Sequence, residues 1–225
     1  MSTILKAAAI AAVMGVGAVA PSNATVIGAI SGVINSGGPG SGTLTETFDG
    51  SGLSVGYTSG VTDFDTYVAG TTHSGVFSGN EWFSNFGTTS ASVTYDLGAV
   101  FSISAMALWN EESSGIGSLD LLISSDGVTF SSLLSGLVPT DNPLGDPLDP
   151  SEYFADVFSF ATTSFRYITL DMSSCPQIDP GSYSSCAIGE VAFRQVAAVP
   201  VPAAGLLLFG ALGGLALIRR RRKVA

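Results

Sequence analysis

Short runs of β-branched and aromatic residues fill the stretch from Thr25 to Val196, and Gly, Ser, Asn and Asp interrupt them at close intervals. Apolar residues do not recur there at the spacing of a helix face. Strands need only a few residues, and small polar residues favour the turns between them. The stretch is therefore predicted to be an all-β sandwich. We find no internal repeat of roughly 20 to 50 residues, which argues against a propeller or a solenoid.

Two pairs of neighbouring strands are predicted. Residues 118–124 and 128–134 flank Asp126-Gly127, a dipeptide that favours a type I′ hairpin because both turn positions need positive φ. Residues 91–98 and 101–110 are expected to form the other pair. In the second of these strands the period of two places five residues on one face: Phe101, Ile103, Ala105, Ala107 and Trp109.

The later part of the chain alternates strands with one long connection. Residues 139–150 contain four prolines, which excludes a central strand and predicts a surface loop. Further strands are predicted at residues 153–160, 164–172 and 187–196.

The charge of this body limits its partners. All 18 acidic residues of the chain lie between Glu46 and Glu190, where Arg166 and Arg194 are the only Lys or Arg side chains, so the net charge there is −16. Such a surface repels phosphate backbones and anionic lipids. Nucleic acid is excluded as a partner, whereas divalent cations and neutral glycans remain open.

The chain has two cysteines, Cys175 and Cys186. In an oxidising compartment they are expected to form a local disulfide. Zinc is the competing interpretation, but two thiolates without neighbouring His or Cys leave a tetrahedral site half empty.

The first residues have the pattern of a secretory signal. Lys6 precedes the apolar residues 7–20, and a small-residue site follows at Ala24. The predicted organisation is a signal peptide with its helix at residues 1–24, a β-sandwich domain at 25–196 and a tail at 197–225.

The tail is predicted to contain a transmembrane helix. Residues 203–218 are apolar and give a helix of roughly 24 Å, which residues 197–202 extend to a spanning length. The arginines that follow should stay on the cytoplasmic side and leave the acidic body outside: Arg219, Arg220, Arg221 and Arg222.

The order of motifs in the body resembles the discoidin or galactose-binding-like jelly roll. VTYDLG comes first, then SISAMALWN, LLISSDGVTFSSL, SFRYITLDM and finally IGEVAF, which together cover residues 91–195. This resemblance implies a jelly-roll sandwich. The body lacks the arginine-rich loops that some members use for binding, so the resemblance leaves the ligand open.

The tail resembles the PEP-CTERM class of sorting signals, in its VPLPA-type form. A proline-containing motif precedes the apolar helix and the arginine cluster: Val199, Pro200, Val201, Pro202, Ala203, Ala204 and Gly205. The resemblance implies that an exosortase-type membrane transpeptidase cuts near the motif. The body would then pass from the inner membrane of a Gram-negative bacterium to the cell surface or to an exopolysaccharide matrix. A permanent membrane anchor is the alternative.

A sugar-binding edge is predicted where aromatic, amide and acidic side chains adjoin. Its candidate residues are Trp82, Asn85, Trp109, Asn110 and Glu111, with Glu81 and Glu112 beside the indoles. In the alternative interpretation Trp109 ends a core strand and the acids are solvated. Carboxylate pairs also suit a glycan hydrolase, although no residue stands out as a proton donor.

Other chemistry is weakly indicated. His73, the only histidine, is expected in an exposed loop, and Ser54 in GLSVG lacks the strand-to-helix context of a nucleophile elbow. No cofactor is predicted apart from a structural calcium ion. Its candidate ligands are Asp63 and Asp65, or else Asp141, Asn142, Asp146 and Asp149.

The leading hypothesis is therefore an exported, non-enzymatic protein that is sorted by its tail and acts by associating with the surface or with exopolysaccharide. The main alternative is a lectin-like module with a defined sugar site. A carboxylate-dependent glycan hydrolase is the second alternative.

Overall fold

A computed structural model describes residues 23–144, 152–177 and 183–196. The predicted signal up to residue 22, the sorting motif and the arginine cluster lie outside the described residues and stay predictions. In the described part of the chain, no helix is both long enough and apolar enough to cross a bilayer.

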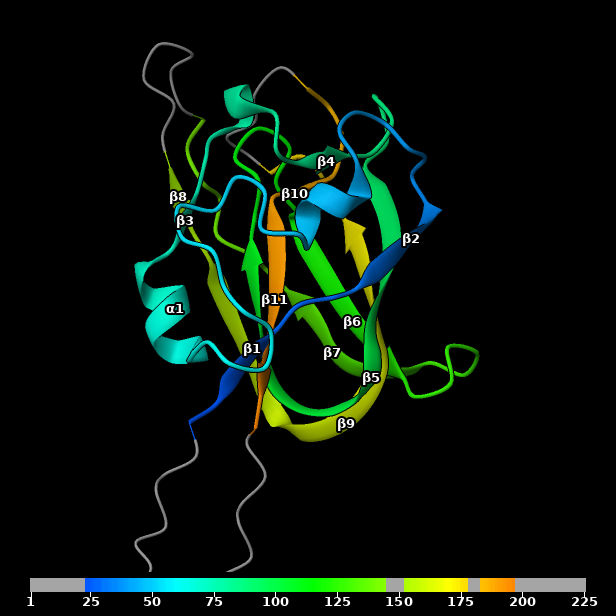
Figure 1. Cartoon of the computed structure of the whole chain (residues 1–225). Coiled ribbons are helices and arrows are strands. Elements are labelled where there is room, and N and C mark those ends of the chain that lie inside the picture. The colour runs from blue at the N-terminus through cyan, green and yellow to red at the C-terminus, as the bar shows by residue number, and fades with distance from the viewer. Residues whose placement is uncertain (1–22, 145–151, 178–182, 197–225) are drawn as a thin grey trace, which may run out of the picture. The chain divides into compact units, whose positions relative to one another are not determined.

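The predicted all-β sandwich is confirmed, and the helices are few and short (Figure 1). The elements in chain order are β1 (Thr25–Ile27), β2 (Ser31–Ser36), η1 (Leu44–Thr47), α1 (Phe64–Gly70), β3 (Thr72–His73), η2 (Val76–Ser78), β4 (Trp82–Phe83), β5 (Ser90–Trp109), β6 (Ser118–Ser124), β7 (Ser131–Leu137), β8 (Tyr153–Phe154), β9 (Asp156–Ser173), β10 (Ala187–Ile188) and β11 (Glu190–Gln195).

Two long strands, β5 and β9, pair along their length and contribute to both layers of the sandwich (Figure 1). Residues 90–96 of β5 and 167–173 of β9 form one layer with β2 on one side and β6 and β7 on the other. Residues 101–108 and 156–165 form the second layer with β11 and β1. The order across the main sheet is β1-β11-β5-β9-β6-β7, with β2 also paired to β5.

The continuity of β5 corrects one expectation, since residues 91–98 and 101–110 form one bent strand and not a pair. The register with β9 shifts between Asp96 and Phe101. Gly98 has a φ of +86°, and its N–H donates to Asp96 Oδ1 at 2.7 Å. An irregularity of this kind bends a strand without ending it. The predicted strands at 153–160 and 164–172 likewise merge into β9 beyond the short β8.

A second irregularity reverses the faces of β5. The register with β9 shifts again between Ile103 and Ala105. Ile103 therefore packs between the layers, whereas Ala105, Ala107 and Trp109 pack on the outer side of the second layer. The prediction that these residues share one face with Phe101 is wrong, because an extra residue in a strand turns every later side chain to the other side.

The strands β6 and β7 pair as predicted, but their connection is longer than a two-residue turn. Of Asp126 and Gly127, only Gly127 has a positive φ, of +74°, so the turn is not type I′. Asp126 Oδ1 instead accepts the N–H groups of Val128 and Thr129, both at 2.9 Å. The aspartate therefore stabilises a loop that its own side chain closes.

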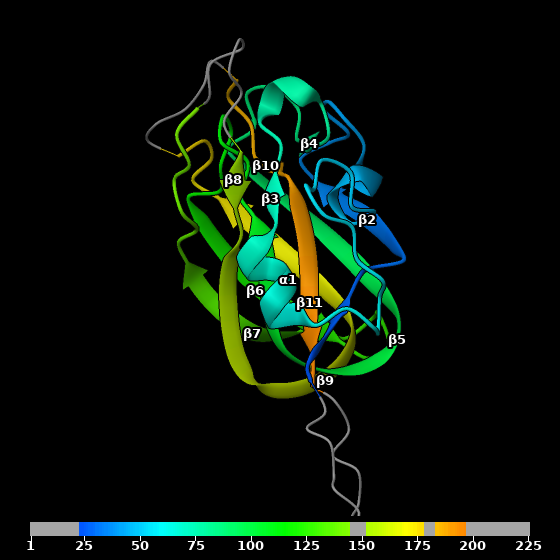
Figure 2. The ribbon, with the colours of Figure 1, turned by 60° about the vertical axis from the view of Figure 1, so that its left-hand side comes forward.

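The core has two parts. The larger part fills the space between the layers and includes Tyr95, Leu121, Ile168 and Phe193 among its buried side chains. The smaller part lies on the outer side of the second layer, where α1 covers β11 and the end of β5 (Figure 2). This second part explains why both faces of the last residues of β5 are buried.

The helix α1 begins at Phe64 and is capped by Asp63, whose carboxylate accepts the N–H of Thr66 at 2.9 Å. This hydrogen bond lowers the pKa of Asp63. Asp65 pairs with Arg194, with 2.7 Å between Oδ2 and Nη2. The two weak calcium candidates therefore have a capping role and an ion pair in this structure. Within the described ranges, no three His, Cys, Asp or Glu side chains gather as a metal site.

Candidate functional site

The two indoles expected at a sugar-binding edge are buried. Trp82 and Trp109 are both 0% exposed. Trp82 Nε1 donates to the carbonyl of Pro39 at 3.1 Å, and Trp109 Nε1 donates to that of Thr71 at 3.2 Å. Neither ring offers a face to a ligand, so their predicted stacking role is wrong. The interpretation that Trp109 ends a core strand is confirmed.

The polar residues after Trp109 also face inward. Asn110 Nδ2 donates to the carbonyl of Thr140 at 2.9 Å and to Gln177 Oε1 at 2.8 Å. Glu111, which is 0% exposed, accepts the N–H of Ser113 at 2.8 Å. These residues hold a buried turn together, and the expectation that the acids at this tip are solvated is wrong. The acids are buried because the turn buries backbone N–H groups that would otherwise have no acceptor. The carboxylates accept hydrogen bonds from these groups.

Of the remaining predicted residues, Asn85 lies apart from this turn and Asn142 contacts it. Asn85 is exposed, and its Oδ1 accepts the N–H of Gly40 at 3.1 Å. Asn142 Nδ2 donates to the carbonyl of Asn110 at 2.8 Å, while Asp146 and Asp149 lie outside the described residues.

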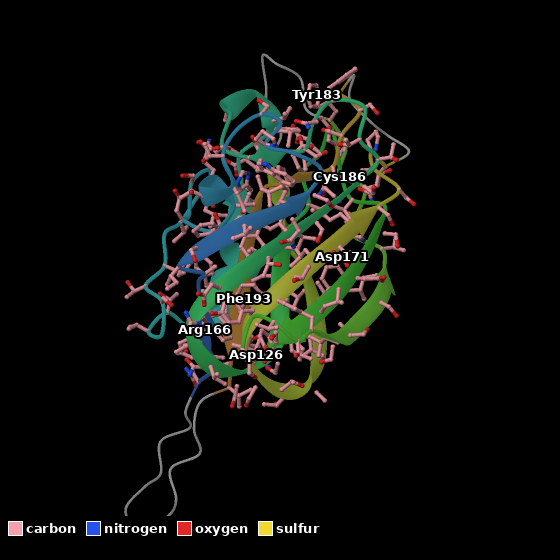
Figure 3. The ribbon with its side chains drawn as sticks, turned by 90° about the vertical axis from the view of Figure 1, so that its right-hand side faces the viewer. Asp126, Arg166, Asp171, Tyr183, Cys186 and Phe193 are labelled. Atoms are coloured by element: carbon pink, nitrogen blue, oxygen red, sulfur yellow. A yellow bond between two sulfur atoms is a disulfide. The ribbon has the colours of Figure 1, made fainter. Side chains whose placement is uncertain are left out.

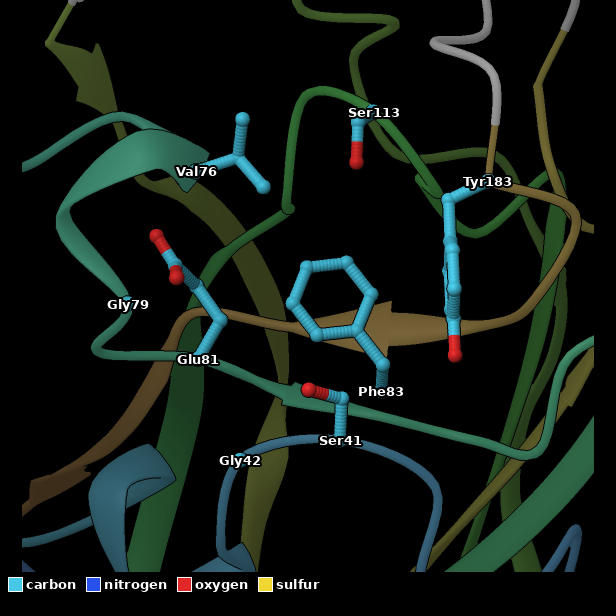
Figure 4. Close-up of a pocket in the computed structure, with 8 residues that line it drawn as sticks. All are labelled: Ser41, Gly42, Val76, Gly79, Glu81, Phe83, Ser113 and Tyr183. Carbon is cyan, nitrogen blue, oxygen red and sulfur yellow. The ribbon is translucent and has the colours of Figure 1, made fainter.

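A pocket of about 310 Å³ opens at the end of the sandwich that carries β4 (Figure 4). Its lining comes from the segment before η1, from η2 and the residue after it, from β4, from the turn after β5 and from the loop before β10. The lining residues are Ser41, Gly42, Val76, Gly79, Glu81, Phe83, Ser113 and Tyr183. Segments that are far apart in the sequence thus meet at one site.

Aromatic rings form one side of this site, which we call the aromatic wall: Phe83, Phe86 and Tyr183. The Phe83 and Tyr183 rings meet edge to face, with centroids 5.6 Å apart. Phe86 packs against Tyr183 at 5.3 Å, although 67% of its surface is exposed. Together the three rings make an aromatic surface, partly exposed, next to the pocket, and this is the kind of surface on which ligands pack.

The polar side of the pocket has an incompletely satisfied carboxylate. Glu81 is 1% exposed, and its Oε2 accepts the N–H of Asn80 at 3.0 Å. Its Oε1 is buried and has no hydrogen-bond partner among the described residues. The Ser113 hydroxyl points into the same space (Figure 4). Buried polar atoms without partners are costly, so this acceptor is suited to a ligand that brings donors.

Burial and mutual repulsion perturb the acids around the pocket. Burial raises the pKa of Glu81 to about 8, with added repulsion from Glu111 and Glu112. Burial also raises the pKa of Glu111 to about 7, although N–H donors oppose the shift. Glu112 Oε1 accepts the N–H of Val76 at 3.0 Å. At the start of β11, burial raises the pKa of Glu190 well above its usual range.

His73 lies beside these acids and not in the exposed loop that the sequence predicts. It is 0% exposed in β3, and its ring stacks at a tilt on Tyr153. Its Nδ1 is 2.8 Å from the carbonyl of Ser74 and 3.7 Å from Glu81 Oε1. Burial lowers the pKa of His73 while it raises that of Glu81. Both shifts favour neutral groups, so this contact is not an ion pair.

The predicted disulfide is confirmed, and it belongs to the site. Cys175 and Cys186 are bonded, with Cα atoms 5.0 Å apart. The loop between them carries Tyr183, whose carbonyl accepts the Ser114 hydroxyl at 2.6 Å. The cross-link and this hydrogen bond hold one ring of the aromatic wall over the pocket.

Sequence reasoning missed most of the residues that line the pocket. Phe83 and Phe86 belong to the aromatic stretch 81–87 that the sequence marks as unusual, but Trp82 is the stronger signal there and is buried. Nothing in the sequence pairs that stretch with Tyr183, because strand pairing between β4 and β10 brings them together. Glu81 is expected beside Trp82 at the sugar-binding edge, but its burial is not predicted.

No family model matches the chain, and no curated protein matches it. Among solved structures it is similar to the CBM32 of AlyQ in complex with 4,5-unsaturated mannuronic acid, at 16% identity over 75% of this chain and 96% of that chain, with a TM-score of 0.46. It is also similar to chitosan-binding module 1 from a chitosanase/glucanase of Paenibacillus sp. IK-5, at 15% identity over 72% and 92%, with a TM-score of 0.46. A third is CpGH89CBM32-5 from Clostridium perfringens in complex with GalNAc-β-1,3-galactose, at 17% identity over 50% and 73%, with a TM-score of 0.39. At these identities and TM-scores, the similarity does not identify a ligand for this chain.

Proposed function

We propose that the described domain is a non-catalytic carbohydrate-binding module whose ligand occupies the pocket beside the aromatic wall. The observation that carries the proposal is the exposed Phe86 ring packed on Tyr183, which itself lines a pocket with a buried and incompletely satisfied carboxylate. This replaces the lectin-like hypothesis built on Trp82 and Trp109 with one built on neighbouring residues.

The chemistry of the site fits a sugar ring. One face of a pyranose is lined by C–H groups, which pack on an aromatic ring, and its rim carries hydroxyl donors and acceptors. The aromatic wall supplies the first kind of contact. Glu81 and the hydroxyls of Ser41 and Ser113 line the same pocket and supply the second kind. A mostly apolar pocket with a few polar groups is the usual arrangement of a small-molecule site.

The site offers little to a hydrolase. Glu111 accepts backbone N–H donors on both of its oxygens, and Glu112 accepts the N–H of Val76. A carboxylate that activates water or attacks a sugar needs a free path to the substrate. We therefore assign these two acids to holding the turn and not to catalysis.

Calorimetric titration with oligosaccharides tests the proposed binding. Replacing Tyr183→Ala or Phe86→Ala should weaken the binding of the tightest oligosaccharide about tenfold, or about 1.4 kcal/mol. Phe154→Ala is the matched control, because Phe154 is 60% exposed and does not line the pocket. It should bind like the unaltered protein. Binding that survives both substitutions in the aromatic wall would overturn the proposal.

We also propose that the module works outside the cytosol, where the tail signal would deliver it to the cell surface or to an exopolysaccharide matrix. The disulfide supports this location, because such bonds persist in oxidising compartments. Mass spectrometry of the surface-associated protein should find a chain that ends near the 199–205 motif. A surface form that keeps residues 219–225 would overturn the sorting proposal and leave a permanent anchor.

A further inference from the structure

The acids around the pocket are not balanced by bases. The body has two arginines, and both are paired elsewhere. Arg166 binds Asp96 with 2.7 Å between Nε and Oδ1 and 2.8 Å between Nη2 and Oδ2, and Arg194 binds Asp65. Figure 3 shows Arg166 near the opposite end of the sandwich from Tyr183. Among the residues that the structure describes, no lysine or arginine lines the pocket.

Within the described part of the chain, the titratable groups around Glu81 are acids, a phenol and one neutral histidine. Glu111 and Glu112 approach it from the turn after β5, and Glu46 approaches it from η1. His73 on β3 is held neutral by burial, and Tyr153 on β8 has a pKa raised well above its usual range. The potential at Glu81 therefore favours positive charge, and low-dielectric walls focus such a field into a cleft.

We infer that the pocket selects sugars that carry a free ammonium group over neutral sugars, and neutral sugars over uronic acids. The inference rests on the proposed function and names the ligand class of the same site. An ammonium group brings three donors and a positive charge to Glu81 Oε1, the buried acceptor without a partner. A uronic acid brings a second carboxylate to a site with no cation to compensate it.

Proton release gives this inference a signature that a structural role for Glu81 would not produce. The pKa of Glu81 is about 8 in the unliganded pocket, so its carboxyl holds a proton at pH 6. A bound ammonium group stabilises the ionised form and lowers that pKa. Binding of an amino sugar at pH 6 should therefore release a proton to the buffer, whereas binding of a neutral sugar should not.

The experiment titrates the full-length protein at pH 6 with three oligosaccharides of equal length, made of glucosamine, N-acetylglucosamine and galacturonic acid. We expect the glucosamine oligomer to bind at least about tenfold more tightly than the N-acetylated one, which is about 1.4 kcal/mol. The uronic acid oligomer should bind the most weakly. Raising the salt concentration should reduce the difference in affinity between the glucosamine and N-acetylglucosamine oligomers, because salt screens charge. Titration in two buffers with different ionisation enthalpies measures the released proton.

Two variants separate the pocket charge from the overall charge. Glu81→Gln should remove both the preference for glucosamine and the proton release. Asp171→Asn removes one exposed negative charge on the face of β9, far from the pocket (Figure 3), and should change neither. If Glu81→Gln does not fold, proton release and salt dependence in the unaltered protein decide the question.

The outcomes distinguish the two claims. Equal or tighter binding of the neutral or uronic acid oligomer overturns the charge selection and leaves the carbohydrate-binding function intact. A folded protein that binds none of the three oligomers overturns the proposed function together with the inference.

Discussion

The two ends of the sandwich treat their acidic residues in opposite ways. At the end where β5 bends, Asp96 is ionised and bound to Arg166, which lowers its pKa. At the pocket end no described lysine or arginine pairs with Glu81 or Glu111, and burial raises their pKa values to about 8 and about 7. Ion pairs at the surface add little to stability, whereas buried acids reduce it wherever they ionise. The ion pair at the first end therefore adds slightly to stability. The buried acids at the second end reduce it, and a bound ligand would offset that loss.

The largest expected effect is the difference in stability between replacing Trp82, whose indole is buried, and replacing Phe86, whose ring is exposed. Trp82→Ala should lower the free energy of unfolding by about 3–5 kcal/mol, because it leaves a cavity between the layers. Phe86→Ala should change it by no more than about 0.5 kcal/mol, because the ring is mostly exposed. Urea denaturation measures both. A loss for Phe86→Ala as large as that for Trp82→Ala would place Phe86 in the fold and not in the site.

The second effect concerns the cross-link at the pocket end. Replacing both cysteines with alanine should cost about 2–3 kcal/mol, because the denatured chain gains the freedom of the opened loop. The same variant should bind oligosaccharide more weakly, since the loop holds Tyr183 in the aromatic wall. Thermal unfolding and calorimetric titration give the two readings. Unchanged sugar binding would show that the loop does not position the ring.

The third effect is the pH dependence of stability, which has opposite signs at the two ends. Glu81 and Glu111 have raised pKa values, so the native state holds protons that the unfolded chain has released. The stabilisation of the native state that comes from these bound protons is complete below about pH 4.5. It is lost as the pH rises toward 7 and 8. We expect the free energy of unfolding to fall by at least about 1–2 kcal/mol between pH 5 and pH 8.

A matched variant assigns this slope to the pocket. In Glu81→Gln the decrease between pH 5 and pH 8 should be smaller, because the amide does not ionise. Urea denaturation across that range measures the slope in both proteins. A slope that Glu81→Gln leaves unchanged would contradict the account of the buried acids.

The smallest expected effect is at the other end. Asp96→Asn should cost about 0.5–1 kcal/mol at pH 7, because it breaks a partly exposed ion pair. Asp96 has a lowered pKa, so its stabilisation is present above the unfolded pKa of about 4 and is lost as the pH falls through the native value. Variant and parent should therefore differ less at pH 2 than at pH 7. If the free energy of unfolding differs equally between variant and parent at pH 2 and pH 7, the ion pair is not the source of the difference.

The sequence predicts much of the sheet because alternation and turn residues are local signals. It places β6 and the core of β9 correctly, it puts β7 three residues too early, at 128–134 in place of Ser131–Leu137, and it predicts the disulfide between Cys175 and Cys186. It divides β5 into two strands because Gly98 resembles a turn, although the strand only bends there. The two register shifts in β5 depend on pairing with β9, which no local pattern reports.

The site was much harder to predict than the fold. Trp82 and Trp109 are the largest apolar side chains, so the core takes them, and smaller rings nearby are left for a ligand. Glu81 and Glu111 look like ordinary solvated acids in the sequence. Their burial depends on a turn and on strand pairing that assemble from five separate segments.

The most direct test of the central claim is an NMR titration of the folded protein with glucosamine and N-acetylglucosamine oligosaccharides. The account predicts the largest amide shifts at Phe83, Ser113 and Tyr183, with the ring signals of Phe86 shifting as well. Shifts confined to the sheet face at Tyr167 and Asp171, with none at the pocket, would contradict it.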